Sequence, residues 1–327
     1  MTSLGFFFQG APRAGRAPGP FGPEPAAGGF RIRLNGRVIV LIGLASAIVY
    51  GVSDFFGGLG ARRIAPLMVS FVSFAVAIVP IAVLTPLAGS VWSAEAVWLG
   101  VIAGLAGAVA IWAFYAALAI GPMSVISPTT AAAAALIPAV AGIATGERFS
   151  PLGYVALAAL VVAAVLLGVT REQQGGRVGA RAVVLAVASG VGFGGYNVVM
   201  EATPPESQYA PLLVDLVAGA LLFGVLLALL RVLRDDSWWG GADAPPVASR
   251  RPGLAFAAAA GLLMSVANAL LVWGLHQGEL AIMGVLASLY PLGTVLLALT
   301  VLRERLTPVQ VAGVALALLA SAALALG

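Results

Sequence analysis

From residue 37 onward, the chain consists of long apolar runs separated by short polar or Gly/Pro-containing breaks. A helix that crosses a bilayer needs about 20 apolar residues, because each residue adds about 1.5 Å across a hydrocarbon layer about 30 Å thick. Ten runs approach this length, and the pattern therefore predicts an all-α membrane protein with ten transmembrane helices. The predicted spans are residues 38–59, 65–87, 97–120, 125–144, 152–169, 180–200, 209–233, 253–275, 281–302 and 309–326.

Residues 1–36 do not share this pattern. They are rich in glycine, proline and alanine and carry scattered arginines. Their one apolar cluster, residues 4–8, is too short for the core of a signal peptide. The composition predicts a disordered N-terminal tail.

The apolar part of the chain repeats itself. Four positions recur 157 residues later without a gap, and they include a Glu-Arg pair that is improbable by chance in a chain with so few charges. The pairs are Gly121 and Gly278, Glu147 and Glu304, Arg148 and Arg305, and Pro151 and Pro308. Earlier in each half the offset is 143, which pairs Gly51 with Gly194 and Asp54 with Asn197.

The repeat divides the chain into two five-helix halves, residues 38–170 and 180–327. Since five is odd, consecutive halves must cross the membrane in opposite senses. This is the inverted repeat typical of many secondary transporters, whose substrate site lies near the midplane between the repeats. Glycine pairs at helical spacing, Gly100 with Gly104 and Gly190 with Gly194, are expected to let neighbouring helices approach closely.

Composition supports the membrane assignment and excludes several other classes. Apolar residues make up 61% of the chain and charged residues 9%, against about 25% charged in soluble domains. The chain has no cysteine and one histidine, so it cannot form a disulfide or a multi-histidine metal site. Its basic residues lie scattered between apolar runs, unlike those of a nucleic-acid-binding face.

Enzyme motifs are missing. The sequence has no Walker A loop, which argues against ATP-driven transport by this chain. Ser189 with His276 lacks the flanking residues of an intramembrane serine protease, and Asp54 with Asp215 lacks the motif of an aspartyl dyad. We therefore expect a protein that is not an enzyme and that needs no cofactor and no metal.

Polar and aromatic residues inside the spans are the candidates for a substrate or coupling-ion site, because ionisable groups are costly in lipid and buried amides need hydrogen-bond partners. Aromatic walls suit apolar or cationic ligands. The candidates are Asp54, Tyr50, Trp112, Tyr115, Tyr196, Asn197, Asn268 and Tyr290.

Each candidate also has a structural interpretation. Asp54 lies nearer the end of its span than the centre, where it could be an interfacial carboxylate paired with Arg62. Asn268 could bond to a neighbouring helix, and the aromatic residues could serve ordinary packing. Glu147 and Glu304 stand at span ends, where we expect them to close a loop and cap the next helix.

Several local motifs resemble those of the drug/metabolite transporter superfamily, EamA type. They are Gly146-Glu147-Arg148 with Pro151, residues 303–310 with Gly313, residues 287–291, and residues 50–58. The resemblance implies ten helices and transport of amino acids, nucleosides, sugars or drug-like compounds. One departure concerns the prolines, since Pro291 corresponds to Ala134 and not to Pro138 at the 157-residue offset.

Together, the repeat and the resemblance predict a secondary transporter of a small metabolite in the cytoplasmic (inner) membrane. We expect alternating access between the halves, export as the direction, and a proton or another cation as a coupling ion. Expected partners are the lipid bilayer and a small-molecule substrate, not nucleic acid, with monomer and homodimer both left open. The alternative is a non-transporting membrane accessory or sensor protein.

The arginines give conflicting indications of orientation. If the N-terminus is cytoplasmic, the cytoplasmic side holds six arginines and the opposite side eleven. The positive-inside rule then favours the reverse orientation, with the termini outside. The family resemblance implies cytoplasmic termini, so the two criteria disagree.

Overall fold

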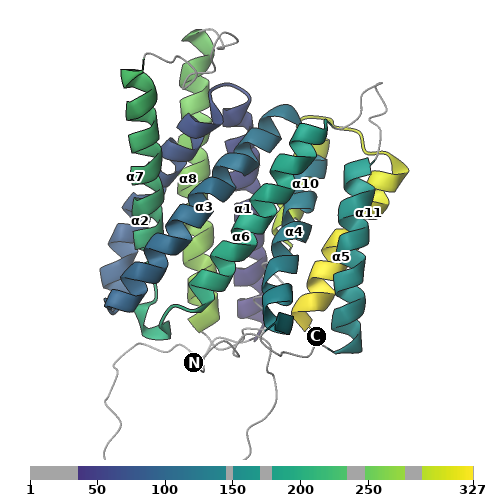
Figure 1. Ribbon diagram of the computed structural model, residues 1–327, viewed down its shortest axis with the longest axis horizontal. Coiled ribbons are helices and arrows are strands. Elements are labelled where there is room, and N and C mark those ends of the chain that lie inside the picture. The colour runs from purple at the N-terminus through teal and green to yellow at the C-terminus, as the bar shows by residue number, and fades with distance from the viewer. Residues whose placement is uncertain (1–35, 145–149, 170–178, 234–246, 277–288, 327) are drawn as a thin grey trace, which may run out of the picture.

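The computed structural model describes residues 36–144, 150–169, 179–233, 247–276 and 289–326. Within these ranges all regular secondary structure is helical, arranged as a bundle (Figure 1). The elements are α1 (Gly36–Ala61), α2 (Pro66–Leu87), α3 (Ala94–Ile120), α4 (Met123–Ala144), α5 (Pro151–Val169), α6 (Ala180–Glu201), the 3₁₀ turn η1 (Pro205–Ser207), α7 (Ala210–Val232), α8 (Val247–His276), α10 (Tyr290–Thr300) and α11 (Pro308–Leu326).

The predicted all-α membrane protein is confirmed. Seven of the described helices are long and apolar enough to cross a bilayer. Three described apolar stretches are shorter, namely Pro151–Ala163, Tyr290–Thr300 and Pro308–Ala320. The start of the predicted span 281–302 lies outside the described residues, as do most of the predicted tail and the motif residues Glu147 and Arg148.

Local sequence signals explain where several helices begin and end. Pro66 stands in the first turn of α2, where its missing amide hydrogen costs nothing. The hydroxyl of Ser93 caps α3 by accepting a hydrogen bond of 3.0 Å from the amide of Ala96. Gly121 ends α3, and the next helix starts two residues later. Pro138 lies inside α4, whereas Pro291 lies in the first turn of α10, so the two prolines occupy different places in their helices.

Neighbouring helices pair in a pattern that exchanges the two halves of the chain. α1 packs against α8 and α10, and α6 packs against α3 and α4. α2 packs against both α7 and α8, while α7 packs against both α2 and α3. α5 packs against α11. Swapping α1 to α5 for α6, α7, α8, α10 and α11, in that order, maps these named pairs onto one another.

Two hydrogen bonds are equivalent under the same exchange of the two halves. The hydroxyl of Ser46 in α1 donates to the carbonyl of Ala267 in α8 at 2.9 Å. The hydroxyl of Ser189 in α6 donates to the carbonyl of Ala110 in α3 at 2.8 Å. Ser189 follows Ser46 by 143 positions, and Ala267 follows Ala110 by 157, which are the two offsets found in the sequence.

Glycines bring the backbones of these helices together, as the Gly100/Gly104 and Gly190/Gly194 spacing predicts. A Cβ atom on Gly104 would lie 2.5 Å from the carbonyl oxygen of Asp215, and one on Gly190 would lie 2.5 Å from that of Thr130. The repeat-related Gly51 and Gly194 pack in the same manner against α10 and α4. Small residues at such contacts allow the close approach that holds membrane helices together.

Glu304, in the turn between α10 and α11, ties the two halves together at one end. Its carboxylate accepts hydrogen bonds from the amides of Met123 at 3.1 Å and Ser124 at 2.9 Å, and from the Ser124 hydroxyl at 2.7 Å. Arg62 lies 3.4 Å away as an ion-pair partner. Glu304 therefore caps α4 of the first half. The helix that follows it, α11, is instead capped by reciprocal bonds between Thr307 and Gln310.

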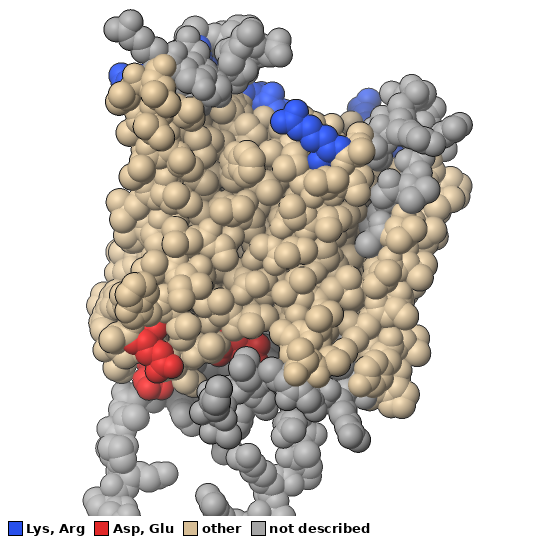
Figure 2. Space-filling model, in the orientation of Figure 1, with Lys and Arg blue, Asp and Glu red and all other residues tan. Residues whose placement is uncertain are grey.

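Charges are segregated between the two ends of the bundle. Arginines gather at one end and carboxylates are visible at the other, the end at which α1 begins and α11 ends (Figures 1 and 2). The topology gives the same result, since Arg62 and Arg63 follow α1, whereas Glu95 begins α3 and Glu206 lies in η1 at the opposite end. The bundle therefore has one strongly basic end.

This segregation predicts the orientation. If the positive-inside rule governs, the arginine-rich end faces the cytoplasm. A reporter inserted at residue 175 should then be active in the cytoplasm, and the same reporter fused after residue 327 should be active only outside. The opposite pair of results would show that charge does not set the orientation and that the termini are cytoplasmic.

Candidate binding site between the helices

Three side chains on one face of α1 bind α8. Ser46 and Ser53 donate hydrogen bonds to the carbonyls of Ala267, at 2.9 Å, and Ala260, at 2.8 Å. Between them along α1, the hydroxyl of Tyr50 donates to Oδ1 of Asn268. The two serine bonds fix the register of α1 on α8, so Tyr50 and Asn268 are held opposite each other. Asn268 therefore has the interhelical partner that a buried amide requires.

A second polar pair joins α6 to α7. The hydroxyl of Tyr196 donates to Oδ2 of Asp215 at 2.9 Å, and only 3% of Asp215 is exposed. Glycines of α3 make room for both residues. A Cβ atom on Gly107 would lie 3.1 Å from the Tyr196 ring, and Gly104 packs on the backbone of Asp215. The pair is thus enclosed where α3, α6 and α7 meet.

Asp54 is buried on the face of α1 that also carries Tyr50, Gly51 and Gly57. Its exposed fraction is 9%, and the backbone of Tyr290 in α10 packs against Gly51, three residues before it. The Tyr115 ring packs directly on Gly57, where a Cβ atom would lie 2.2 Å from it. Among the described residues, Asp54 forms no hydrogen bond and no ion pair.

The pairing of Asp54 with Arg62, which the interfacial interpretation offered, is not formed, because Arg62 is engaged elsewhere. Its guanidinium donates to the carbonyls of Leu118 at 3.1 Å and Gly121 at 2.9 Å and pairs with Glu304. These partners lie at the arginine-rich end of the bundle. Asp54 lies about two helical turns from the end of α1 at Ala61 and is buried.

These residues occupy two levels of the bundle interior. Asp54 lies about 10 Å along α1 from its end at Ala61, whereas Asp215 lies about 8 Å from the opposite-end start of α7 at Ala210. Tyr50, one helical turn before Asp54 on α1, lies between the two levels. We define the polar column as Tyr50, Asp54, Tyr115, Tyr196, Asp215, Asn268 and Tyr290.

Two candidates lie apart from the column. Trp112 is 40% exposed and lies on the outward face of α3 that also carries Leu105 and Val109. Asn197 is exposed near the end of α6, one turn beyond Gly194. Conversely, Asp215 belongs to the column, although the sequence presents it only as a possible member of an enzyme dyad. Its position in the sequence does indicate a functional site, because it is the sole carboxylate of the span 209–233 and carboxylates inside spans are functional candidates by default.

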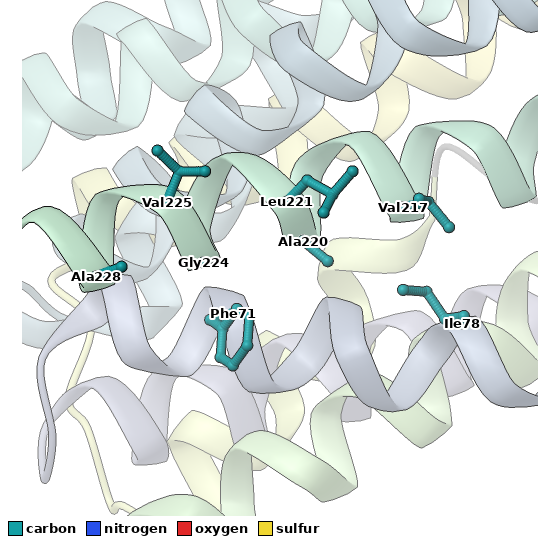
Figure 3. A pocket seen from close by; sticks show the side chains of 8 residues that line it. All are labelled: Phe71, Ile78, Val217, Ala220, Leu221, Gly224, Val225 and Ala228. Carbon is teal, nitrogen blue, oxygen red and sulfur yellow. The ribbon is translucent and has the colours of Figure 1, made fainter.

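The grooves on the outside of the bundle are of another kind. One has a volume of about 370 Å³ and lies between α2 and α7 (Figure 3). Its lining is entirely apolar and consists of Phe71, Ile78, Val217, Ala220, Leu221, Gly224, Val225 and Ala228. Such a surface suits acyl chains and offers no group that could recognise a polar metabolite. Within the described residues, no group of three or more side chains could hold a metal ion.

The helices and the column define a polytopic membrane protein with a polar interior. Residues 180–326 match the model of the EamA-like transporter family, which confirms the resemblance on the second half of the chain. The second half of the chain is thus similar to the EamA-like transporter family, and seven of the described helices are long and apolar enough to cross a membrane.

Comparison with solved structures supports the fold. A crystal structure of another protein aligns with a TM-score of 0.55 at 18% identity, covering 88% of this chain and 96% of the other. At this identity the likeness concerns the fold alone. None of the curated proteins matches the chain significantly.

The glycine contacts around the column predict a stability difference between two chemically identical substitutions. Gly104→Ala places a methyl group against the Asp215 backbone, which cannot move aside like a side chain, and should destabilise the protein by about 1–3 kcal/mol. Gly195→Ala meets open space and should be neutral or slightly stabilising, because alanine favours the helix. Thermal unfolding of both variants in detergent measures the difference, and equal melting temperatures would contradict the packing.

Proposed function

We propose that this protein is a secondary transporter that moves a small metabolite across the cytoplasmic membrane by alternating access between residues 38–170 and 180–327. The observation that carries the proposal is the polar column, which lies inside a bundle of membrane-spanning helices. Its residues come from both halves of the chain: α1 and α3 belong to the first half, and α6, α7, α8 and α10 belong to the second half. A path of polar groups between two halves is what a carrier needs and what a packed structural protein avoids.

The exchange of helix pairs supports an inverted repeat of five helices in each half. The hydrogen bonds from Ser46 to Ala267 and from Ser189 to Ala110 are equivalent under that exchange. A two-fold relation of this kind provides two conformations of similar energy, because the halves can swap roles. Opening of the column toward one face and then the other would follow from that swap.

The groups of the column favour a polar organic substrate over an ion alone. Tyrosine hydroxyls, an amide and two carboxylates offer hydrogen bonds, and the rings offer apolar faces. Amino acids, nucleosides, sugars and drug-like compounds carry matching groups. We propose export as the direction and a proton or another cation as the coupling ion.

Reconstitution into liposomes tests the proposal. The purified chain should drive saturable uptake of at least one labelled compound from these four classes, and preloaded unlabelled compound should accelerate the exchange. Protein-free liposomes and liposomes that carry heat-unfolded protein are the controls. Absence of flux for every class, together with measurable ligand binding, would favour the non-transporting accessory or sensor protein instead.

Asp54 should carry the pH dependence of that flux. A carboxylate in the column can bind and release a proton as it faces either side, whereas an asparagine of the same size cannot. Asp54→Asn should therefore abolish the dependence of uptake on an imposed pH gradient while the protein still reaches the membrane. Glu95→Gln, which removes an exposed carboxylate at the start of α3, is the matched control and should leave it unchanged.

The structure provides a second carboxylate, Asp215, for comparison. Uptake that remains pH-driven in Asp54→Asn but not in Asp215→Asn would transfer the coupling role to α7. Uptake that remains pH-driven in both variants would show that neither carboxylate of the column couples transport to protons.

A further inference from the structure

Glu304 of the second half binds three donors of the first half at the start of α4. Its carboxylate accepts hydrogen bonds from the amides of Met123, at 3.1 Å, and Ser124, at 2.9 Å, and from the Ser124 hydroxyl at 2.7 Å. The first amides of a helix have no partner within that helix, and Pro122 before α4 has no side-chain acceptor for them. The cap of α4 therefore comes from the other half of the chain.

The turn that carries Glu304 has an unusual backbone. Arg303 has a φ of 54°, a left-handed conformation that residues other than glycine rarely adopt. The amide of Glu304 donates to the carbonyl of Ala298 at 3.1 Å, which holds the turn against the end of α10. Strained residues of this kind persist only where surrounding contacts maintain them, and they cluster at clamps and switch regions. The bonds from Glu304 to α4 are contacts of that type.

Arg62 adds α1 and the end of α3 to the same cluster. Its guanidinium lies 3.4 Å from Glu304 and donates to the carbonyls of Leu118, at 3.1 Å, and Gly121, at 2.9 Å. The bonds to the two carbonyls stay within the first half, whereas every bond of the Glu304 carboxylate crosses between the halves. We define the latch as Arg62, Met123, Ser124 and Glu304.

The bundle is closed beneath the latch and more accessible farther along the column. A Cβ atom on Gly58 of α1 would lie 2.6 Å from the Met123 side chain, so α1 and α4 are in close contact there. Met123 and Ser127, on successive turns of α4, are both 0% exposed. Farther from the arginine-rich end, Tyr50 and Asn268 are only partly buried. The structure therefore shows a conformation that is closed at the arginine-rich end.

We propose that the latch is the gate of the polar column at the arginine-rich end, and that the bonds of Glu304 break when the halves move to open that end. The side chains of Arg62 and Glu304 are 31% and 15% exposed, so water at the end of the bundle can solvate both charges as they part. This inference rests on the proposed function only in taking the two halves as moving against each other. Its test needs no flux.

A thiol beneath the latch reports its opening. The chain contains no cysteine, so an introduced cysteine is its sole thiol. Ser127 lies one turn inside α4 from Met123 and Ser124, and its buried hydroxyl has no hydrogen-bond partner among the described residues. Ser127→Cys therefore removes no described hydrogen bond. Its rate of labelling by a membrane-impermeant maleimide, in vesicles of known orientation, measures access, and Arg181→Cys at the exposed start of α6 marks the arginine-rich end.

Loss of the Glu304 charge should open the gate. Glu304→Gln keeps the size of the side chain but replaces one acceptor oxygen by an amide donor, so labelling of Ser127→Cys from the arginine-rich end should become at least about fivefold faster. Ser124→Ala removes only the bond of 2.7 Å and should give a smaller increase. Glu95→Gln, which changes an exposed carboxylate at the opposite end, should have no effect.

A second thiol separates opening of the gate from general loosening of the bundle. Ser70 lies one turn inside α2, at the same end and depth as Ser127, and is also 0% exposed. Its hydroxyl donates to the carbonyl of Pro66 in its own helix at 2.9 Å, so Ser70→Cys removes no described hydrogen bond between helices. Labelling of Ser70→Cys should remain slow in Glu304→Gln.

Three results would overturn the proposal: unchanged labelling of Ser127→Cys in Glu304→Gln, equal acceleration at Ser127→Cys and Ser70→Cys, and acceleration from the opposite end alone. If Glu304→Gln does not reach the membrane, the same criteria apply to Ser124→Ala. If labelling accelerates as expected but no compound crosses the vesicle membrane, the gate stands and transport is wrong. If the chain transports a compound but labelling is unchanged, transport stands and the gate is wrong.

Discussion

The arrangement of the whole bundle depends on close contact between helix backbones. In lipid, burying an apolar side chain against another helix gains little over burying it in acyl chains, so dense packing and interhelical hydrogen bonds must supply the stability. Gly104 and Gly261, which are 157 positions apart, each place a helix against the backbone of its neighbour, at Asp215 and Ser73 respectively. These contacts admit no Cβ atom and therefore fix both depth and register.

Fixed register decides which polar groups meet. Because α3 sits on the backbone of Asp215, and Gly107 leaves space for the Tyr196 ring, the carboxylate and the phenol are held 2.9 Å apart. Glu304 shows the other outcome for a carboxylate, since it satisfies two amides, a hydroxyl and Arg62 at the end of the bundle. Among the described residues, Asp54 has neither arrangement. The three carboxylates therefore differ by position within the described part of the bundle.

The sequence predicts the helices well because span length and hydropathy follow from the thickness of the bilayer. It predicts faces poorly, because helices that are apolar all around carry no periodicity to mark the inside. Trp112 and Tyr115 are three residues apart, yet one is 40% exposed and the other 1%. Polarity in the sequence selected Asp54 and Asn268, which the structure places in the column, and Asn197, which it places outside it. Asp215 stands out in the sequence only as a carboxylate inside a span, because the sequence alone does not show which residues face one another across helices.

The repeat relates Asp54 and Asp215 through helix contacts, and the sequence offsets of 143 and 157 do not show this relation by themselves. Along α1 and α6, Asp54 corresponds to Asn197, which would leave the second half without an acid. The contacts of Gly104 and Gly261 make Asp215 of α7 the structural counterpart of Ser73 in α2, whose hydroxyl donates a hydrogen bond to the carbonyl of Ala257 at 3.0 Å. Each level of the column thus keeps one carboxylate, but on a different helix. In the proposed exchange of environments between the halves, this arrangement would keep one carboxyl group at each of the two levels while the levels remain chemically distinct.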